Sequence, residues 1–292
     1  MYDLIPISEK TYYIDCPAKM GIYQIDDKNV YLIDSGNDKE AGKKVLKILN
    51  EKDWNLKAII NTHSNADHIG GNHLLQQRTG CKIYANAIEA AFTKYPLLEP
   101  SFLFGAYPPK ELRNKFLMAA SSDVLDITDE SFPRELEVIP LEGHFFHMIG
   151  LKTPDNVVFL ADCISSENTI NKYQISFIYN VEQYLDTLNK VETMQANYFV
   201  PAHAEVTSNI KSLVEINRKK VFEIMDKLLK DCEQPYCFEE LLQKVFTDYN
   251  LTMDFNQYVL VGSTIRSYLS YLKDNKKLTA LFEQNKLLWK TI

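Results

Sequence analysis

The 292-residue sequence predicts an α/β fold followed by a small, mainly helical domain. Up to about residue 205, short runs of aromatic and β-branched residues alternate with stretches whose apolar residues recur at helical spacing. Beyond that point helical spacing dominates, and the chain ends in a pattern typical of a β-hairpin. We therefore expect two domains, at residues 1–205 and 206–292.

Turn-forming Asp, Asn, Ser, Gly and Pro residues separate the predicted elements of the first domain. The predicted strands are 11–14, 20–25, 29–33, 56–60, 81–85, 136–141, 157–160 and 198–200, and the predicted helices are 39–51, 71–79 and 181–195. Residues 96–133 fit neither pattern, because they contain several prolines and frequent aromatic residues. This segment is either a partly helical insertion over the functional site or an ordinary packed connector.

The most informative motif lies at residues 62–71, which read Thr-His-Ser-Asn-Ala-Asp-His-Ile-Gly-Gly. It places three side chains that can bind a metal, His63, Asp67 and His68, within six residues. The motif follows a predicted buried strand and ends in two glycines before a helical pattern. A strand that ends in such a turn can aim several side chains at one point, as a metal site requires.

Further metal-capable residues follow other predicted strands. His144 comes after strand 136–141, Asp162 after strand 157–160, and His203 after strand 198–200. Rigid scaffolds commonly place functional residues on the loops that follow their strands. We therefore expect these side chains to converge with the 62–71 motif on one site.

Composition excludes several functional classes. The hydrophobic content of 46% and charged content of 24% are typical of a globular protein. A net charge of −7 disfavours nucleic acid as the main partner, because phosphate binding needs a basic surface. No apolar run is long enough to span a membrane, and the first residues lack a signal-peptide pattern. With five scattered cysteines that fit reduced thiols, we expect a cytoplasmic protein.

The second domain contains three predicted helices, at 206–229, 238–246 and 258–272, and a hairpin within residues 277–290. This order suggests a winged-helix-like domain. Such domains often bind DNA, but a fold does not dictate a function and this chain is acidic. We expect the domain to act instead as a cap or as a contact in a homodimer.

The motifs together resemble those of the metallo-β-lactamase-fold hydrolases, in particular the hydroxyacylglutathione hydrolase-like branch with a helical C-terminal extension. Residues 62–71 resemble the family signature Thr-His-x-His-x-Asp-His-x-Gly-Gly, and the resemblance covers about residues 10–205. Residues 30–36 resemble its early strand ending in a structural Asp, here Asp34. The resemblance implies a four-layer αββα sandwich with two metal ions in a cleft at its edge.

The resemblance also implies a set of metal ligands. The first site would use His63, position 65, His144 and Asp162, and the second site would use Asp67, His68, His203 and Asp162. Asp162 would bridge the two metals.

Position 65 departs from the family pattern, because this chain has Asn65 where the signature has His. An amide oxygen is a neutral and weak ligand for zinc compared with imidazole. We therefore expect the second site to fill first and the first site to bind at least ~10- to 100-fold more weakly than an intact one.

Two further histidines have no ligand role that the resemblance carries over. His147 lies three residues after His144, whereas relatives often space this pair by four. It is expected to orient a neighbour, to contact substrate or to lie on the surface. His73 lies on the predicted helix after the motif and is expected to point away from the site.

The leading functional hypothesis is a hydrolase that uses one or two Zn²⁺ ions to activate water. Asp67 and His63 are the expected catalytic residues: Asp67 would orient the nucleophile, and His63 would act as a general base when the first site is empty. Iron or manganese can replace zinc in such a ligand set. The alternatives are a degenerate metal-binding domain without turnover and an iron-dependent oxidoreductase.

The expected substrate is a small molecule with an ester, thioester, lactone or related bond. The aromatic residues of segment 96–133 favour an apolar or amphipathic substrate. The fold serves too many chemistries for the sequence to name the substrate itself.

Overall fold

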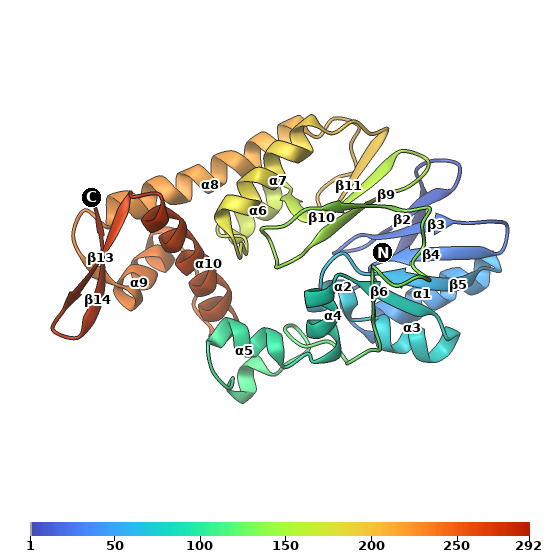
Figure 1. Ribbon diagram of the computed structural model, residues 1–292, viewed down its shortest axis with the longest axis horizontal. Helices are drawn as coiled ribbons and strands as arrows, with labels where there is room; N and C mark the ends of the chain where they lie inside the picture. Colours follow the sequence, from blue (N-terminus) through green and yellow to red (C-terminus); the bar gives the residue numbers. More distant parts are fainter. Residues whose placement is uncertain (1) are drawn as a thin grey trace.

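Two β-sheets face each other in the computed structural model, which describes residues 2–292 (Figure 1). The larger sheet has the order β1-β2-β3-β4-β5-β6-β7 and the smaller has the order β11-β10-β9-β8. The strands of the larger sheet are β1 (Asp3–Pro6), β2 (Thr11–Asp15), β3 (Met20–Gln24), β4 (Asn29–Ile33), β5 (Asn55–Ile60), β6 (Lys82–Ala85) and β7 (Leu125–Asp126). Those of the smaller are β8 (Glu137–Pro140), β9 (Ile149–Lys152), β10 (Val157–Ser165) and β11 (Tyr198–His203).

Apolar side chains from both sheets fill the space between them. Ile33 and Ile60 of the larger sheet belong to the same buried cluster as Leu151, Phe159 and Val200 of the smaller sheet. Strands β4, β5 and β6 pair in parallel, so their carboxyl ends meet at one edge of the sandwich. That edge carries the 62–71 motif.

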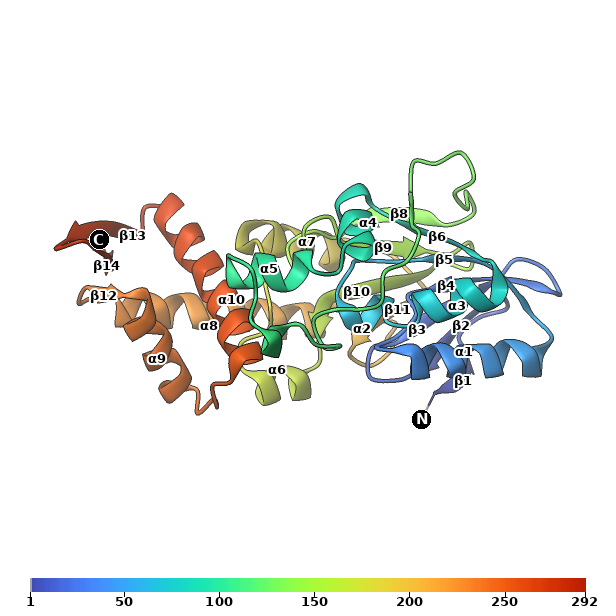
Figure 2. The ribbon, with the colours of Figure 1, turned by 90° about the horizontal axis from the view of Figure 1, so that it is seen from below.

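Helices cover the outer face of the larger sheet. The main ones are α1 (Lys39–Lys52) and α3 (Asn72–Thr79), which Figure 2 shows side by side along this face. Val45 and Leu49 of α1 and Leu75 of α3 are buried against apolar residues of the strands. This spacing of apolar residues along a helix is the pattern that predicted α1 from the sequence.

The smaller sheet is covered on its outer face by α7 (Val181–Thr193) and the start of α8 (Lys211–Asp231), with α6 (Glu167–Tyr173) beside them (Figure 1). Leu188 of α7 and Val214 of α8 share a buried cluster with Leu160 of β10. The layers therefore run helix, sheet, sheet, helix, and the predicted αββα fold class is confirmed.

The last third of the chain forms the helical part that the sequence predicts. Helix α8 runs from the sandwich into it, and it continues through β12 (Tyr236–Cys237), α9 (Phe238–Asp248), α10 (Phe255–Asp274) and the hairpin β13 (Leu278–Glu283) and β14 (Lys286–Thr291). Its strands form a sheet of order β12-β14-β13. One buried cluster extends from β10 through α8 to α10, so this part shares a core with the sandwich. The winged-helix comparison and the boundary at residue 206 stay predictions.

Several elements differ from the expectation. Helix α8 begins at Lys211 rather than at residue 206, because Phe199 and Thr207 exchange two backbone hydrogen bonds that hold residue 207 in an extended bridge. Segment 96–133 contains helix α5 (Leu98–Phe104) and the short 3₁₀ helix η1 (Lys110–Leu112), so its partly helical character is confirmed. Helices α4 (Ala87–Lys94) and α6 and strands β1, β7, β9 and β12 were not predicted.

Among residues 2–292, no helix combines the length and the apolar character that a membrane crossing requires.

Candidate metal centre

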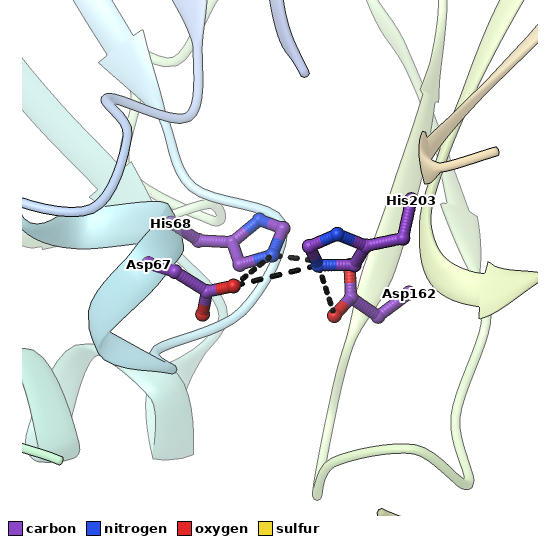
Figure 3. Close-up of side chains that lie close together, drawn as sticks. All are labelled: Asp67, His68, Asp162 and His203. Carbon is purple, nitrogen blue, oxygen red and sulfur yellow. Dashed lines mark ion pairs between the residues drawn. The ribbon is translucent and has the colours of Figure 1, made fainter. Parts of the chain in front are cut away.

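The candidate ligands come together at the edge of the sandwich where the two sheets meet. The backbone N–H of Ile149 in β9 donates to the carbonyl of Thr62 after β5, at 2.9 Å, which joins the sheets beside the site. Figure 3 shows Asp67 and His68 approaching from the larger sheet and Asp162 and His203 from the smaller one. Residues far apart in the sequence therefore meet only because the two sheets pack face to face.

The side chains form two groups that share one carboxylate. Potential ligand atoms lie within 4.8 Å of one another in the group Asp67, His68, Asp162 and His203, and likewise in the group His63, His144 and Asp162. These groups match the second site and, apart from position 65, the first site that the family resemblance implies. The role of each residue as a ligand is a proposal, which the geometry below supports.

In the second site, Asp162 and Asp67 face the two imidazoles from opposite sides. His68 Nε2 lies 3.0 Å from Asp162 Oδ1 and 3.8 Å from Asp67 Oδ2. His203 Nε2 lies 3.2 Å from Asp162 Oδ2 and 3.4 Å from Asp67 Oδ2. Asp67 is the most open of the four, with 43% of its side chain exposed, whereas His68 is buried. Solvent therefore reaches the centre from the side of Asp67.

Each histidine ring is fixed through its Nδ1 atom. His144 Nδ1 donates to the carbonyl of Phe177 at 2.9 Å, and His203 Nδ1 donates to the carbonyl of Pro17 at 2.9 Å. His68 Nδ1 donates to Asp34 at 2.8 Å. A neutral imidazole that donates from Nδ1 keeps a lone pair on Nε2. All three rings thus turn that lone pair towards the centre.

Asp34 anchors the remaining ring through Thr62. It follows β4 and adopts a left-handed conformation with a φ of 58°. Its carboxylate accepts from the backbone N–H of Thr62 and from the Thr62 hydroxyl, both at 2.8 Å. Because that hydroxyl donates to Asp34, its lone pair is free to accept from His63 Nδ1, 3.0 Å away. His63 Nε2 therefore also faces the centre.

The glycines that end the motif permit a close approach of two segments. A Cβ on Gly71 would lie 2.3 Å from the carbonyl oxygen of Ser35, and one on Gly70 would lie 2.3 Å from the backbone of Asn37. No side chain fits at either position. The short helix α2 (Ala66–Ile69), which carries Asp67 and His68, is therefore pressed against the end of β4 and Asp34.

Strand β10 differs from the prediction at Asp162. The sequence places Asp162 beyond a strand that ends at residue 160, but β10 continues to Ser165. Ala161 has a φ of 50°, and the pairing with β11 shifts register on both sides of it. A bulge redirects the side chain that follows, so Asp162 points into the centre from within the strand. Strand β11 likewise continues beyond the predicted end at residue 200, and His203 is its last residue.

Asn65 lies against the first site with its amide held in one orientation. Its Nδ2 donates to Glu99 Oε1 at 2.8 Å, and its Oδ1 lies 3.2 Å from His144 Nε2. Since His144 donates from Nδ1, its Nε2 and the amide oxygen of Asn65 both present lone pairs. Two acceptors that face each other in this way are suited to share a cation.

Three buried atoms of the centre make no well-aligned hydrogen bond: His63 Nε2, His68 Nε2 and Asp162 Oδ1, of which the last two face each other at 3.0 Å as an ion pair. Buried polar atoms are almost always satisfied, and exceptions need an explanation. Imidazole nitrogens and carboxylate oxygens are ordinary ligands of zinc, iron and manganese. The residues present therefore fit a metal centre.

The charges of the centre shift its pKa values strongly. Burial lowers the pKa of His203, but Asp162 and Asp67 outweigh it and raise this pKa to about 10. The pKa of His68 is raised well above its usual range in the same way, by Asp162 and Asp67 against burial. Burial and the neighbouring His68 instead hold the pKa of His63 well below its usual range. In the metal-free protein His63 is therefore neutral, while His68 and His203 take up protons.

Two buried carboxylates that bond to Ser64 and Asn65 of the 62–71 motif were not predicted from the sequence. Glu99 of α5 holds Asn65, and Glu89 of α4 accepts from the backbone N–H and hydroxyl of Ser64, at 3.1 and 2.6 Å. Glu89 also accepts from the backbone N–H of His147 at 2.8 Å. Both side chains are buried, but acidic residues in short helices give no sequence signal that separates them from surface residues.

His147 and His73 take no place in the two sites. The backbone of His147, rather than its ring, makes the contact with Glu89. His73 Nδ1 bonds to the carbonyl of Ser121 at 2.8 Å, on the outer side of α3.

A sequence model of the Metallo-beta-lactamase superfamily matches residues 14–203, which is more than half of the chain. The chain belongs to the metallo-beta-lactamase superfamily. The match begins in β2 and ends at His203, so it spans both sheets and every candidate ligand. The C-terminal helical part lies outside it.

Curated proteins with related sequences include hydroxyacylglutathione hydrolases. The chain is 28% identical over 137 residues to hydroxyacylglutathione hydrolase GloC of Haemophilus influenzae, covering 46% of this chain and 57% of that protein. It is 46% identical over 123 residues to a hydroxyacylglutathione hydrolase of Rhodobacter capsulatus, covering 42% of this chain and 39% of that protein. The chain thus spans about half the length of these curated relatives.

Two solved structures match the fold of almost the whole chain. A beta-lactamase domain protein from Burkholderia ambifaria has a TM-score of 0.74 at 13% identity and covers 99% of this chain and 94% of its own. A metallo-beta-lactamase family protein from Thermus thermophilus has a TM-score of 0.74 at 14% identity and covers 97% of this chain and 99% of its own. This coverage includes the C-terminal helical part, so the likeness of fold extends beyond the sandwich.

Proposed function

We propose that this protein is a zinc-dependent hydrolase that cleaves a small thioester, ester or lactone. One observation carries the proposal. Four imidazoles, each fixed through Nδ1, present Nε2 to a centre that also contains Asp162, and two of these nitrogens are buried without a well-aligned hydrogen bond. This is the arrangement of a ligand set rather than of histidines that are satisfied within the protein.

The proposed ligands divide unequally between the two sites. The second site has two imidazoles and two carboxylates, so it can supply the three protein ligands of a catalytic zinc and still leave a position for water. The first site has His63, His144, the shared Asp162 and the weaker amide oxygen of Asn65. We propose that zinc fills the second site first and the first site only at higher concentration.

The protein's own residues supply the remaining chemistry. A bound zinc ion acts as a Lewis acid and lowers the pKa of a water ligand towards about 7. Asp67, which lies on the open side of the centre, accepts a hydrogen bond from the attacking water and orients it towards the substrate. His63 has a neutral ring and an Nε2 atom without a hydrogen bond, so it accepts a hydrogen bond from the water when the first site is empty and acts as a general base, although its lowered pKa makes it a weak one.

Aromatic side chains beside the first site favour an apolar acyl group on the substrate. Phe146 stacks on Tyr179 with ring centroids 4.1 Å apart, and Phe102 lies 5.1 Å from Phe146. All three are only partly buried. The names of the sequence relatives, which are hydroxyacylglutathione hydrolases, favour a thioester over the other bonds.

The test is hydrolysis of a panel of small acyl thioesters, esters and lactones by zinc-loaded protein. His203→Ala and Asp67→Ala are expected to lose at least about 100-fold in kcat/KM together with the tightly bound zinc, because each removes a ligand. His73→Ala is the matched control, since His73 bonds to Ser121 outside the centre. Full activity in metal-free Asp67→Ala protein would rule the mechanism out.

Asn65 favours one alternative, a metal-binding protein without turnover. Its amide replaces a strong ligand, so one metal could bind while catalysis is lost. In that case zinc would bind at the second site, and no member of the panel would be hydrolysed. An iron-dependent oxidoreductase would instead be purified with iron, which elemental analysis detects.

A further inference from the structure

Helix α10 of the C-terminal part reaches the first site through a chain of hydrogen bonds. The link passes through the loop at residues 174–180, which lies between α6 and α7. This loop provides the carbonyl of Phe177 that holds the Nδ1 atom of His144. The loop also forms hydrogen bonds to the backbone next to His144. The N–H groups of Tyr179 and Asn180 donate to the carbonyl of Gly143 at 2.9 and 3.0 Å.

Two side chains of α10 fix this loop. The hydroxyl of Thr264 accepts from the backbone N–H of Ile178 at 3.3 Å, and the hydroxyl of Ser267 donates to the carbonyl of Tyr179 at 2.7 Å. Thr264 and Ile178 are buried, so water cannot replace the contact between them. The bonds to α10 thus fix the loop directly after Phe177, the residue that orients His144.

The same helix also supports the other side of the first site. Val259 of α10 packs with Leu103 of α5 in one buried cluster, and Phe177 of the 174–180 loop packs against it. Figures 1 and 2 both show α10 beside α5. Helix α5 carries Glu99, which holds the amide of Asn65 at 2.8 Å. Both His144 and Asn65 of the first site are therefore held by elements that rest on α10.

The two imidazoles of the second site have their supports elsewhere. His68 is held by Asp34 after β4, and His203 is held by the carbonyl of Pro17 between β2 and β3. Neither contact involves the C-terminal part. We infer that α10 is a structural support of the first metal site alone, with Thr264 and Ser267 as positioning residues for His144. This inference rests on the proposed metal binding.

The experiment compares full-length wild type with Thr264→Val/Ser267→Ala, which removes both hydroxyls at nearly constant volume. Thr264→Ser/Ser267→Thr keeps the hydroxyls and serves as the conservative variant. Ser270→Ala is the matched control, because Ser270 is exposed on the same helix. Zinc is titrated against a chelating dye to give the affinity of each successive zinc equivalent. By the proposed order of filling, the first equivalent occupies the second site and the second equivalent occupies the first site. The Nδ1–H proton resonance of His144 is followed by NMR in metal-free protein.

In Thr264→Val/Ser267→Ala, the second zinc equivalent, which occupies the first site, is expected to bind about tenfold less tightly. Loss of a residue that orients a metal ligand typically weakens metal binding by about 10- to 100-fold, and the lower end applies here because Thr264 and Ser267 act through the loop. The first equivalent stays unchanged, and the His144 Nδ1–H exchanges faster with solvent. The conservative variant restores both readouts. An equal loss at both sites, or no loss at either, overturns the inference.

A failure of zinc binding in the wild type would instead count against the proposed function. The NMR readout still decides the inference in that case, because it needs no metal. Unchanged exchange of the His144 proton in the double variant would show that α10 does not hold this ring.

Discussion

The carboxylate of Asp34 accepts a hydrogen bond from Nδ1 of His68 at 2.8 Å, and the same oxygen accepts from the Thr62 hydroxyl at 2.8 Å. Through Thr62 it also sets the ring of His63. One residue outside both sites therefore decides which nitrogen of two candidate ligands is free. The residues that orient the candidate ligands therefore matter for metal binding as well as the ligands themselves.

Replacing Asp34 by Asn is expected to weaken binding of the first zinc equivalent by about 10- to 100-fold. An amide that turns its NH₂ towards His68 no longer accepts from Nδ1. The proton of the neutral ring then moves to Nε2, which cannot bind a metal. The measurement is zinc titration against a chelating dye. Asp53→Asn is the matched control, because Asp53 has a similar φ of 55° but lies exposed at the end of α1. Equal affinity in the two variants would contradict the role of Asp34.

Asn65→His is expected to strengthen binding of the second zinc equivalent by at least about tenfold, since imidazole is a better ligand for zinc than an amide oxygen. Two zinc ions per chain should then be retained after dialysis, as elemental analysis can show. Thioester hydrolysis by the same variant separates two cases. Increased turnover means that the weak ligand Asn65 limits catalysis in the wild type. Unchanged turnover means that zinc in the second site is sufficient for catalysis. An unchanged second affinity would show that the fourth ligand of the first site comes from elsewhere.

Gly143→Ala is expected to destabilise the fold by more than about 3 kcal/mol, because two costs add. Gly143 has a φ of +116°, and a Cβ there would lie 2.2 Å from the backbone nitrogen of Tyr184 in α7. Alanine therefore meets backbone strain, worth about 1–3 kcal/mol, and also displaces a buried helix. Gly105→Ala is the control, because Gly105 has a φ of +78° and nothing within 4 Å of the added Cβ. Urea unfolding of both variants should separate the clash from the strain, and equal losses would rule out the clash.

Because Glu89 is buried, we expect the free energy of unfolding to fall as the pH rises towards neutrality. Burial raises the pKa of Glu89 from 4.5 to about 7, although bonds from Ser64 and His147 oppose this. The folded protein thus holds a proton that the unfolded chain releases at lower pH. The stabilisation is complete below about pH 4.5 and is lost as the pH rises through about 7, by roughly 3 kcal/mol in all. Urea unfolding of metal-free protein from pH 5 to 8 measures this slope, which Glu89→Gln should flatten. An identical slope in the variant would assign it to other groups.

The sequence alone was enough for the core of the fold and for the list of candidate ligands. Strand β4 and hairpin β13–β14 follow directly from local patterns, because apolar periodicity and turn residues act within a few positions. The 62–71 motif is equally local. Its agreement with the family signature also identifies the partners at positions 144, 162 and 203, which no local pattern links to it.

Other features were decided only by tertiary packing. Ala161 forms the bulge that turns Asp162 into the centre, and Glu99 becomes a buried partner of Asn65, although neither residue is marked in the sequence. The support that α10 gives to His144 joins segments that are distant in the chain. Contacts of this kind depend on which faces of the sheets and helices meet, and a local pattern of residues carries no record of them.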